Sequence, residues 1–109
     1  MFELSGSDFD PVLNPSAETI RRAILDLTGI FGESFLILGP VGDEMTYMQV
    51  CGGGNDGYLL EYQEGSMERH YQSVDQHLPA DKVLQAFASY LEGTDLWLTS
   101  ILWKKLDLS

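Results

Sequence analysis

The sequence predicts an α+β fold, an antiparallel sheet of four to five strands with two helices packed on one face. Short apolar segments between residues 35 and 72, separated by turns that contain glycine, have the length and spacing of strands. Segments near 17–28 and 79–92 instead carry apolar residues at helical spacing. The short links between strands favour antiparallel hairpins, because a parallel crossover needs about a dozen residues or more. With 109 residues and 44% apolar composition, the chain suits one domain, residues 1–109, around a single core.

The N-terminal part predicts an extended segment followed by a helix. Residues 1–15 are rich in Ser, Asp, Asn and Pro, and the positions that precede proline disfavour helix. Either Asn14 or Ser16 can cap the helix that follows, and Gly29 is a natural end for it. The apolar stripe of this helix consists of Ile20, Ala23, Ile24 and Leu27.

Four strands are predicted in the middle of the chain. They span residues 35–38, 45–51, 58–63 and 67–72. The loop between the second and third strands, Cys51 to Gly57, contains the spacing GxGxxG. A strand follows this loop where a dinucleotide site needs a helix, so the glycines predict a hairpin loop with positive φ angles.

The C-terminal third predicts a second helix and a short last element. Pro79 fits the first helical position, where its missing N–H group is harmless, and Gly93 ends the helix. The apolar stripe consists of Val83, Leu84, Phe87, Tyr90 and Leu91. A short turn follows, and residues 102–106 add a last strand or an irregular segment. We expect Trp97 and Trp103 in the core, because indole rings supply large apolar area.

The turn after residue 62 sets the pairing of the third and fourth strands. With a loop of two or four residues, Tyr62 faces Met67 and Glu61 faces Glu68. One sheet face then carries Tyr58, Leu60, Tyr62, Met67, Arg69 and Tyr71, and the other carries Leu59, Glu61, Gln63, Glu68 and His70. We expect the first face to meet the helices. On the exposed face the two glutamates repel each other by up to about 1 kcal/mol.

Acidic residues dominate the charge of the chain, whose formal net charge is -11. Between residues 23 and 68 there is no Lys or Arg, and there are eight carboxylates: Asp26, Glu33, Asp43, Glu44, Asp56, Glu61, Glu64 and Glu68. A folded acidic surface attracts basic partners and repels nucleic acid and anionic membranes. We therefore expect a basic protein as partner, and neither nucleic acid nor a membrane.

Candidates for catalysis or metal binding are few. Cys51, His70 and His77 match no thiol-enzyme motif, and one cysteine without an apolar N-terminal stretch predicts a cytoplasmic protein. Glu61, Glu68 and His70 on one face leave open a metal site or the acid–base pair of a small hydrolase. Because metal sites usually show more histidines, we expect no metal, no cofactor and no enzymatic activity.

Several segments carry a family resemblance. In order, they are Tyr47-Met48-Gln49-Val50, Gly52-Gly53-Gly54, Leu59-Leu60-Glu61-Tyr62, Arg69-His70-Tyr71, the helix from Val83 to Leu91 with Gly93, and the two tryptophans. Over about residues 35–106 the chain resembles immunity protein family one of bacterial polymorphic toxin and contact-dependent inhibition systems. The resemblance implies a small cytoplasmic α+β protein that is not an enzyme. It implies binding to a cognate toxin domain, commonly a nuclease or a deaminase, whose active region is blocked.

Together, the charge and the resemblance predict a partner-binding site on the exposed face and loops of the acidic hairpins. Its predicted residues are Asp43, Glu44, Asp56, Glu61, Glu64 and Glu68, with Tyr58 as an aromatic anchor. Carboxylates suit this role because they accept charge-assisted hydrogen bonds from Arg and Lys. Two alternatives stay open: a small acidic hydrolase or metal-binding enzyme that uses Glu61, Glu68 and His70, and a secretion adaptor or chaperone.

Overall fold

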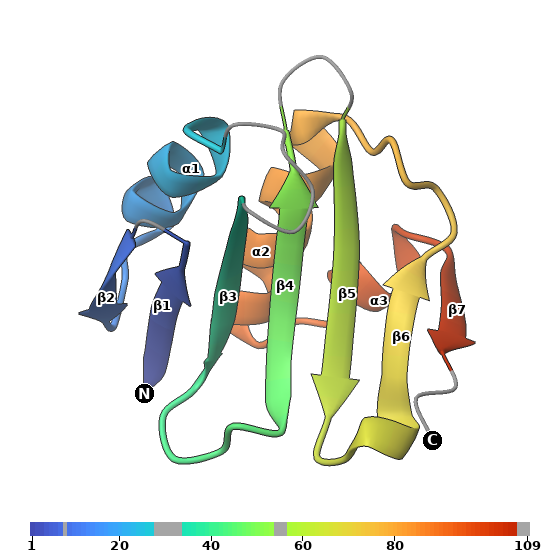
Figure 1. Ribbon diagram of the computed structural model, residues 1–109, viewed down its shortest axis with the longest axis horizontal. Helices are drawn as coiled ribbons and strands as arrows, with labels where there is room; N and C mark the ends of the chain where they lie inside the picture. The colour runs from blue at the N-terminus through green and yellow to red at the C-terminus, as the bar shows by residue number, and fades with distance from the viewer. Residues whose placement is uncertain (8, 28–33, 54–56, 107–109) are drawn as a thin grey trace.

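The computed structural model describes residues 1–7, 9–27, 34–53 and 57–106. In these ranges one antiparallel sheet of seven strands has the order β2-β1-β3-β4-β5-β6-β7 (Figure 1). The strands are β1 (Phe2–Gly6), β2 (Phe9–Leu13), β3 (Phe35–Pro40), β4 (Thr46–Gly52), β5 (Tyr58–Glu64), β6 (His70–Ser73) and β7 (Trp103–Leu106). The α+β class and the antiparallel arrangement are thus confirmed, whereas the predicted four to five strands are too few.

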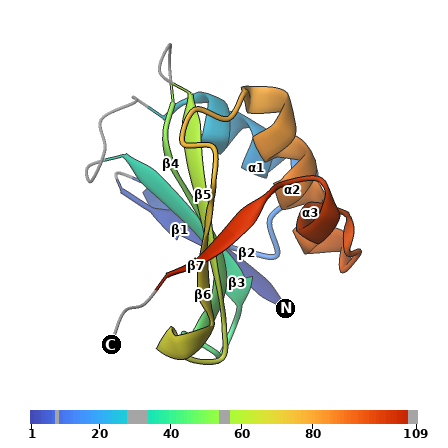
Figure 2. The same ribbon diagram turned by 90° about the vertical axis from the view of Figure 1, so that its right-hand side faces the viewer.

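The helices lie together on one face of the sheet, as the edge-on view shows (Figure 2). They are α1 (Ala17–Leu25), α2 (Ala80–Glu92) and the short α3 (Leu96–Thr99). Ser16 caps α1, since its Oγ accepts a hydrogen bond from Thr19 N at 3.1 Å, and Gly93 ends α2 in the left-handed region with φ 80°. Pro79 lies at the N-cap of α2, one position before the predicted one. α1 ends at Leu25 with Asp26 at its C-cap, so the predicted end near residue 28 with Gly29 as the stop is wrong; Gly29 itself lies outside the described residues. None of the described helices is long and apolar enough to cross a membrane.

The N-terminal segment is extended as predicted, but it belongs to the sheet. β1 pairs with β2 on one side and with β3 on the other. The segment therefore supplies two strands at one edge of the sheet, where the sequence predicted none. Leu4 is completely buried, while its neighbours Glu3 and Ser5 are partly exposed. This alternation is a strand signal, which the turn-forming residues of the segment obscured.

The fourth predicted strand begins too early. Residues Met67–Arg69 form the 3₁₀ helix η2, and β6 starts only at His70. The register therefore pairs Glu61 with Gln72 and Tyr62 with Tyr71, so the predicted Glu61–Glu68 and Tyr62–Met67 pairs are wrong. The reason is a longer turn, which Arg69 closes by donating its backbone N–H to Ser66 O at 3.1 Å. The three η2 residues are consequently exposed and lie on neither sheet face.

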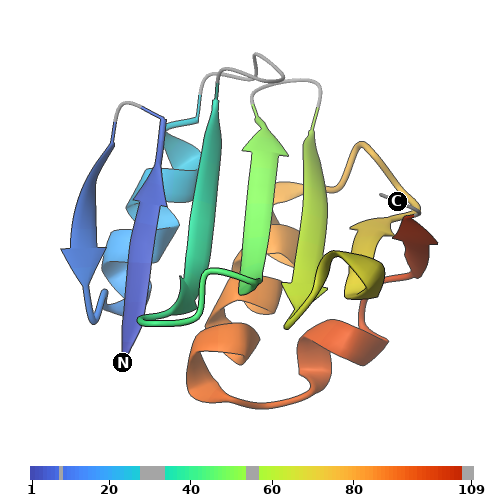
Figure 3. The same cartoon turned by 60° about the horizontal axis from the view of Figure 1, so that its bottom comes forward.

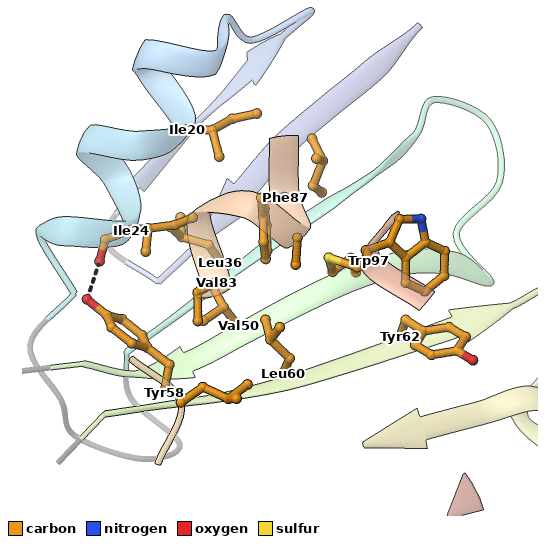
Figure 4. Packing of buried hydrophobic residues seen from close by; sticks show 14 of the residues in the cluster. Ile20, Ile24, Leu36, Val50, Tyr58, Leu60, Tyr62, Val83, Phe87 and Trp97 are labelled. Atoms are coloured by element: carbon orange, nitrogen blue, oxygen red, sulfur yellow. Dashed lines mark hydrogen bonds between the residues drawn. The ribbon is translucent and has the colours of Figure 1, made fainter. Parts of the chain in front are cut away.

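The core lies between the sheet and the helices (Figure 4). It includes Ile20 and Ile24 of α1, Val83 and Phe87 of α2, and Leu36, Val50 and Leu60 of the central strands. At one end of the core the packing is mainly aromatic. The ring centroid of Tyr62 lies 4.7 Å from the ring centroids of Tyr71, Trp97 and Trp103. Trp97 is 7% exposed, and the half-buried Trp103 packs against the same core, which confirms the prediction for both tryptophans.

Candidate functional site

The candidate site is the sheet face opposite the helices, which we call the open face. The strand registers assign it Glu3, Ser5, Phe35, Ile37, Gly39, Tyr47, Gln49, Cys51, Leu59, Glu61, Gln63, His70, Gln72, Lys104 and Leu106. None of the three described α helices covers this face (Figure 2). Most of its side chains are only partly buried, and these include Ile37, Gln49 and Leu59. It is therefore the large sheet surface that a partner can reach.

Charge is distributed unevenly over the sheet. The five strands from β2 to β5 in spatial order contain no Lys or Arg. All six Lys and Arg residues of the chain lie elsewhere: Arg21 and Arg22 on α1, Arg69 on η2, Lys82 on α2, and Lys104 and Lys105 on β7. The part of the open face formed by the five strands therefore has no Lys or Arg side chain of its own to offset its carboxylates.

Four of the predicted site residues lie at one end of the sheet, where the β3–β4 and β5–β6 connections lie side by side (Figure 3), although the alternation of β5 turns Glu64 to the helix side. We call this group the acidic end; it consists of Asp43, Glu44, Glu64 and Glu68. The two connections are joined by a hydrogen bond from Gly65 N to Met45 O at 3.0 Å. Burial chiefly, and then the charges of Glu64 and Asp43, raise the pKa of Tyr90 to about 12.

The acidic end contains fixed and free carboxylates. Asp43 accepts hydrogen bonds from Met45 N at 3.1 Å and Thr46 Oγ1 at 2.8 Å, so it stabilises its own turn. Glu64 accepts a hydrogen bond from Arg69 Nη2 at 2.9 Å. Glu44 and Glu68 are exposed, and the described part of the chain offers neither of them a hydrogen bond or an ion pair. These two carboxylates are thus available to a partner without loss of an internal contact.

Tyr58 cannot be the exposed aromatic anchor that the sequence suggested. Its side chain points toward the helices, it is 5% exposed, and its hydroxyl donates to Ile24 O at 3.4 Å (Figure 4). The alternation of β5 places it beside Leu60 and Tyr62, and burial raises its pKa. Asp56, another predicted site residue, lies outside the described residues.

Glu61 lies at the centre of the open face and contacts His70. The distance from His70 Nε2 to Glu61 Oε1 is 3.1 Å, and His70 Nδ1 lies 3.0 Å from Gln63 Oε1. Gln63 in turn donates from Nε2 to Met45 O at 3.0 Å and accepts a hydrogen bond from Tyr47 at 3.5 Å. His70 and Gln63 are buried although no helix covers them. Alternation in the sequence placed Glu61, Gln63 and His70 on one face, but the part played by Tyr47 had no local signal.

The geometry offers little for the catalytic alternatives. Glu68 lies on η2 and not opposite Glu61, and the described residues contain no group of three His, Cys, Asp or Glu side chains fit for a metal. Burial, and then the charge of Glu61, raise the pKa of Cys51 to about 11, so the thiol stays protonated at neutral pH. The described glycines of the loop have the predicted positive φ, with 95° at Gly52 and 78° at Gly57, and β5 follows; residues 54–56 lie outside the described ranges.

A hollow of about 510 Å³ lies on the open face beside the acidic end. It is lined by Glu3, Ser5, Ile37, Gly39, Pro40, Val41, Gly42, Asp43, Glu44, Thr46, Tyr47 and Gln49. Three of these residues are acidic, and none of the described lining residues is basic.

Comparisons of the chain with protein-family models, curated proteins and solved structures find no match.

Proposed function

We propose that the protein is a cytoplasmic immunity protein that binds a basic bacterial toxin domain, commonly a nuclease or a deaminase, and blocks its active region. The observation that supports this most is the open face, a broad sheet surface whose strands from β2 to β5 carry no Lys or Arg. The acidic end adds four carboxylates next to it. The sequence resemblance to immunity protein family one supports the same role.

The physical basis is complementarity of charge. Enzymes that act on nucleic acid are basic around the groove that holds the substrate. An acidic surface of matching size competes for that groove, raises the association rate and disfavours neutral or acidic partners. Binding also relieves the self-repulsion of a chain whose net charge is -11.

The structure refines which carboxylates take part in the proposed interface. Glu61 and Glu64 already have internal partners in His70 and Arg69, with which an external partner would have to compete. Glu44 and Glu68 are exposed, and no partner for either is found within the described ranges. We therefore assign the attraction of the partner mainly to the free carboxylates, and the packing area to half-buried residues such as Ile37 and Tyr47.

The test begins with the reading frame immediately upstream, which should encode a large exported protein with a variable C-terminal domain. Production of that domain should arrest growth of a bacterial host, and this chain produced in the same cell should restore growth. Bound to the purified chain, the domain should lose its activity on nucleic acid. A domain that stays active when bound would contradict inhibition and would indicate a secretion adaptor or chaperone.

Charge reversal on two faces makes the test specific. The double change Glu44→Lys and Glu68→Lys should slow association by about tenfold or more at low salt, and less at high salt. The matched control is the double change Asp81→Lys and Glu92→Lys, two exposed positions of α2 on the helix side of the molecule, which alters the net charge equally and should alter association much less. Stopped-flow association kinetics at two salt concentrations measure both effects. Equal effects of the two sets would remove the acidic end from the interface.

A further inference from the structure

One of the residues that line the hollow on the open face is a glycine near the end of β3. Gly39 of β3 is paired with Glu3 of β1 on one side and lies next to Tyr47 of β4 on the other. A Cβ atom at Gly39 would lie 2.7 Å from Thr46 O and 3.2 Å from Tyr47 Cβ, so no other residue fits without a shift. The close approach at Gly39 is that of the β4 backbone, and Glu3, Gly39 and Tyr47 all line the hollow.

The walls of the hollow combine an aromatic ring, aliphatic surface and carboxylates. Ile37 and Pro40 supply apolar area, and Tyr47 is half-buried. Glu3 is also only partly exposed, and neither Glu3 nor Glu44 has a hydrogen bond or an ion pair with any part of the chain that the structure describes. A carboxylate that has lost part of its water and gained no partner is costly, and a cation would offset that cost.

The ring of Tyr47 is held in place before any partner arrives. Its hydroxyl donates to Gln63 Oε1 at 3.5 Å, and its centroid lies 6.1 Å from the centroid of the His70 imidazole in an edge contact. Burial, and then the charge of Glu61, raise the pKa of Tyr47, so the phenol stays neutral at physiological pH. A fixed side chain loses little conformational entropy when a ligand packs on it.

We propose that this hollow holds an arginine side chain of the basic partner; the inference rests on the proposed function and names the partner chemistry at one point of its interface. Guanidinium is planar and weakly hydrated, so it packs against an aromatic ring and donates two N–H groups to a carboxylate. The aliphatic stem of arginine matches the apolar surface of Ile37. A lysine ammonium matches the charge alone, because it is compact and strongly hydrated.

The hollow can be tested without the toxin, with three capped tetrapeptides of arginine, lysine and citrulline. Citrulline has nearly the shape of arginine but no charge. Titration followed by backbone NMR should show the arginine peptide shifting the amides of Gly39, Gly42 and Tyr47, with affinity about fivefold or more above that of the lysine peptide. The citrulline peptide should cause no shift. Equal affinity for the arginine and lysine peptides, or shifts spread evenly over all acidic residues, would overturn the inference.

Variants locate the effect. The double change Glu3→Gln and Glu44→Gln should weaken binding of the arginine peptide about tenfold, and Ile37→Trp should also weaken it by filling the hollow. Glu92→Gln removes the same kind of charge from α2 and should leave binding unchanged. Thermal unfolding checks that each variant remains folded. Unchanged peptide binding by the two hollow variants would overturn the inference.

The two proposals fail in different ways. Suppose that the chain protects cells from the toxin and that the double variant Glu3→Gln and Glu44→Gln protects equally well at limiting expression. The proposed arginine site in the hollow is then wrong, whereas the immunity role stands. If the arginine peptide binds selectively in the hollow but the chain neutralises no upstream toxin domain, arginine binding by the hollow is supported. The arginine then comes from a partner other than a toxin.

Discussion

The two faces of the sheet are built from the same strands but differ in chemistry. In β3, Leu36 and Leu38 point to the helices, and each is at most 1% exposed. Ile37 between them points to the open face and is partly exposed. β4 repeats the contrast, with Met48 buried and Gln49 partly exposed. The helix-covered face therefore supplies the apolar burial that stabilises the fold, and the open face is left free to carry charge.

The buried polar side chains on the open face have hydrogen-bond partners. His70 and Gln63 are buried there, but each contacts the other and at least one further polar group. Among the described residues, no buried side-chain nitrogen or oxygen lacks a hydrogen-bond partner. Burial of polar groups is tolerated when the network is complete, so this part of the open face has a defined structure although no helix covers it.

The largest expected difference between the faces comes from neighbouring residues in β3. Leu38→Ala should lower the free energy of unfolding by about 2–5 kcal/mol, because it leaves a cavity under the helices. Ile37→Ala removes a similar aliphatic group from the open face and should cost clearly less. Urea denaturation of both variants measures the two values. Equal losses would show that the open face is covered as tightly as the other.

A second difference concerns two glutamates that the sequence paired. Glu61→Lys should lower the free energy of unfolding by about 1–3 kcal/mol, because the buried His70 loses its carboxylate partner. The sequence-based expectation was the opposite, a small gain from relief of repulsion between Glu61 and Glu68. Glu68→Lys on η2 is the matched control, and as an exposed change it should stay within about 0.5 kcal/mol. Chemical denaturation of the two variants decides between these expectations.

Two tyrosines on opposite faces sharpen the assignment of the interface. Tyr58→Phe removes one hydrogen bond to Ile24 O, which still accepts from Leu27 N at 3.2 Å, and should cost about 1 kcal/mol of stability or less. It should not change the affinity for the partner, since Tyr58 is buried. Tyr47→Ala should weaken partner binding at a temperature at which thermal unfolding shows the variant to be fully folded. Loss of affinity in the Tyr58 variant without loss of stability would contradict the placement of that ring.

At neutral pH the smallest effect comes from the buried phenols. Burial chiefly, and then neighbouring carboxylates, raise the pKa of Tyr62 and Tyr90 from 10.0 to about 12. The folded state thus favours the protonated phenols, and their contribution to stability is complete below pH 10 and is lost as the pH rises through about 12. Ultraviolet titration of the folded protein should show these tyrosines ionising late, and Tyr62→Phe should remove one late step. Ionisation of all five tyrosines at their ordinary pKa would contradict their burial.

Local sequence signals were enough for the helices and for most of the sheet. Apolar spacing and caps placed α2 and the start of α1 correctly, but not the end of α1, and alternation assigned Leu60 and Tyr62 to one face and Glu61 and Gln63 to the other. These features depend on residues only a few positions apart, and their spacing is visible in the chain. The candidate site was predicted in part: the open face and the acidic end carry five of the seven proposed residues, one lies outside the described ranges, and Tyr58 is buried.

The sequence alone thus determined the fold class, the two main helices, the central strands and the sign of the surface charge. Only the tertiary structure decided that β1 and β2 complete the sheet and that β6 starts at His70, after η2. It also decided that Glu61 contacts His70 and not Glu68. It further decided that Glu3, Gly39 and Tyr47 line one hollow on the open face. The physical reason is that strand pairing joins residues far apart in the chain, and a change of turn length by a few residues alters every partner beyond it.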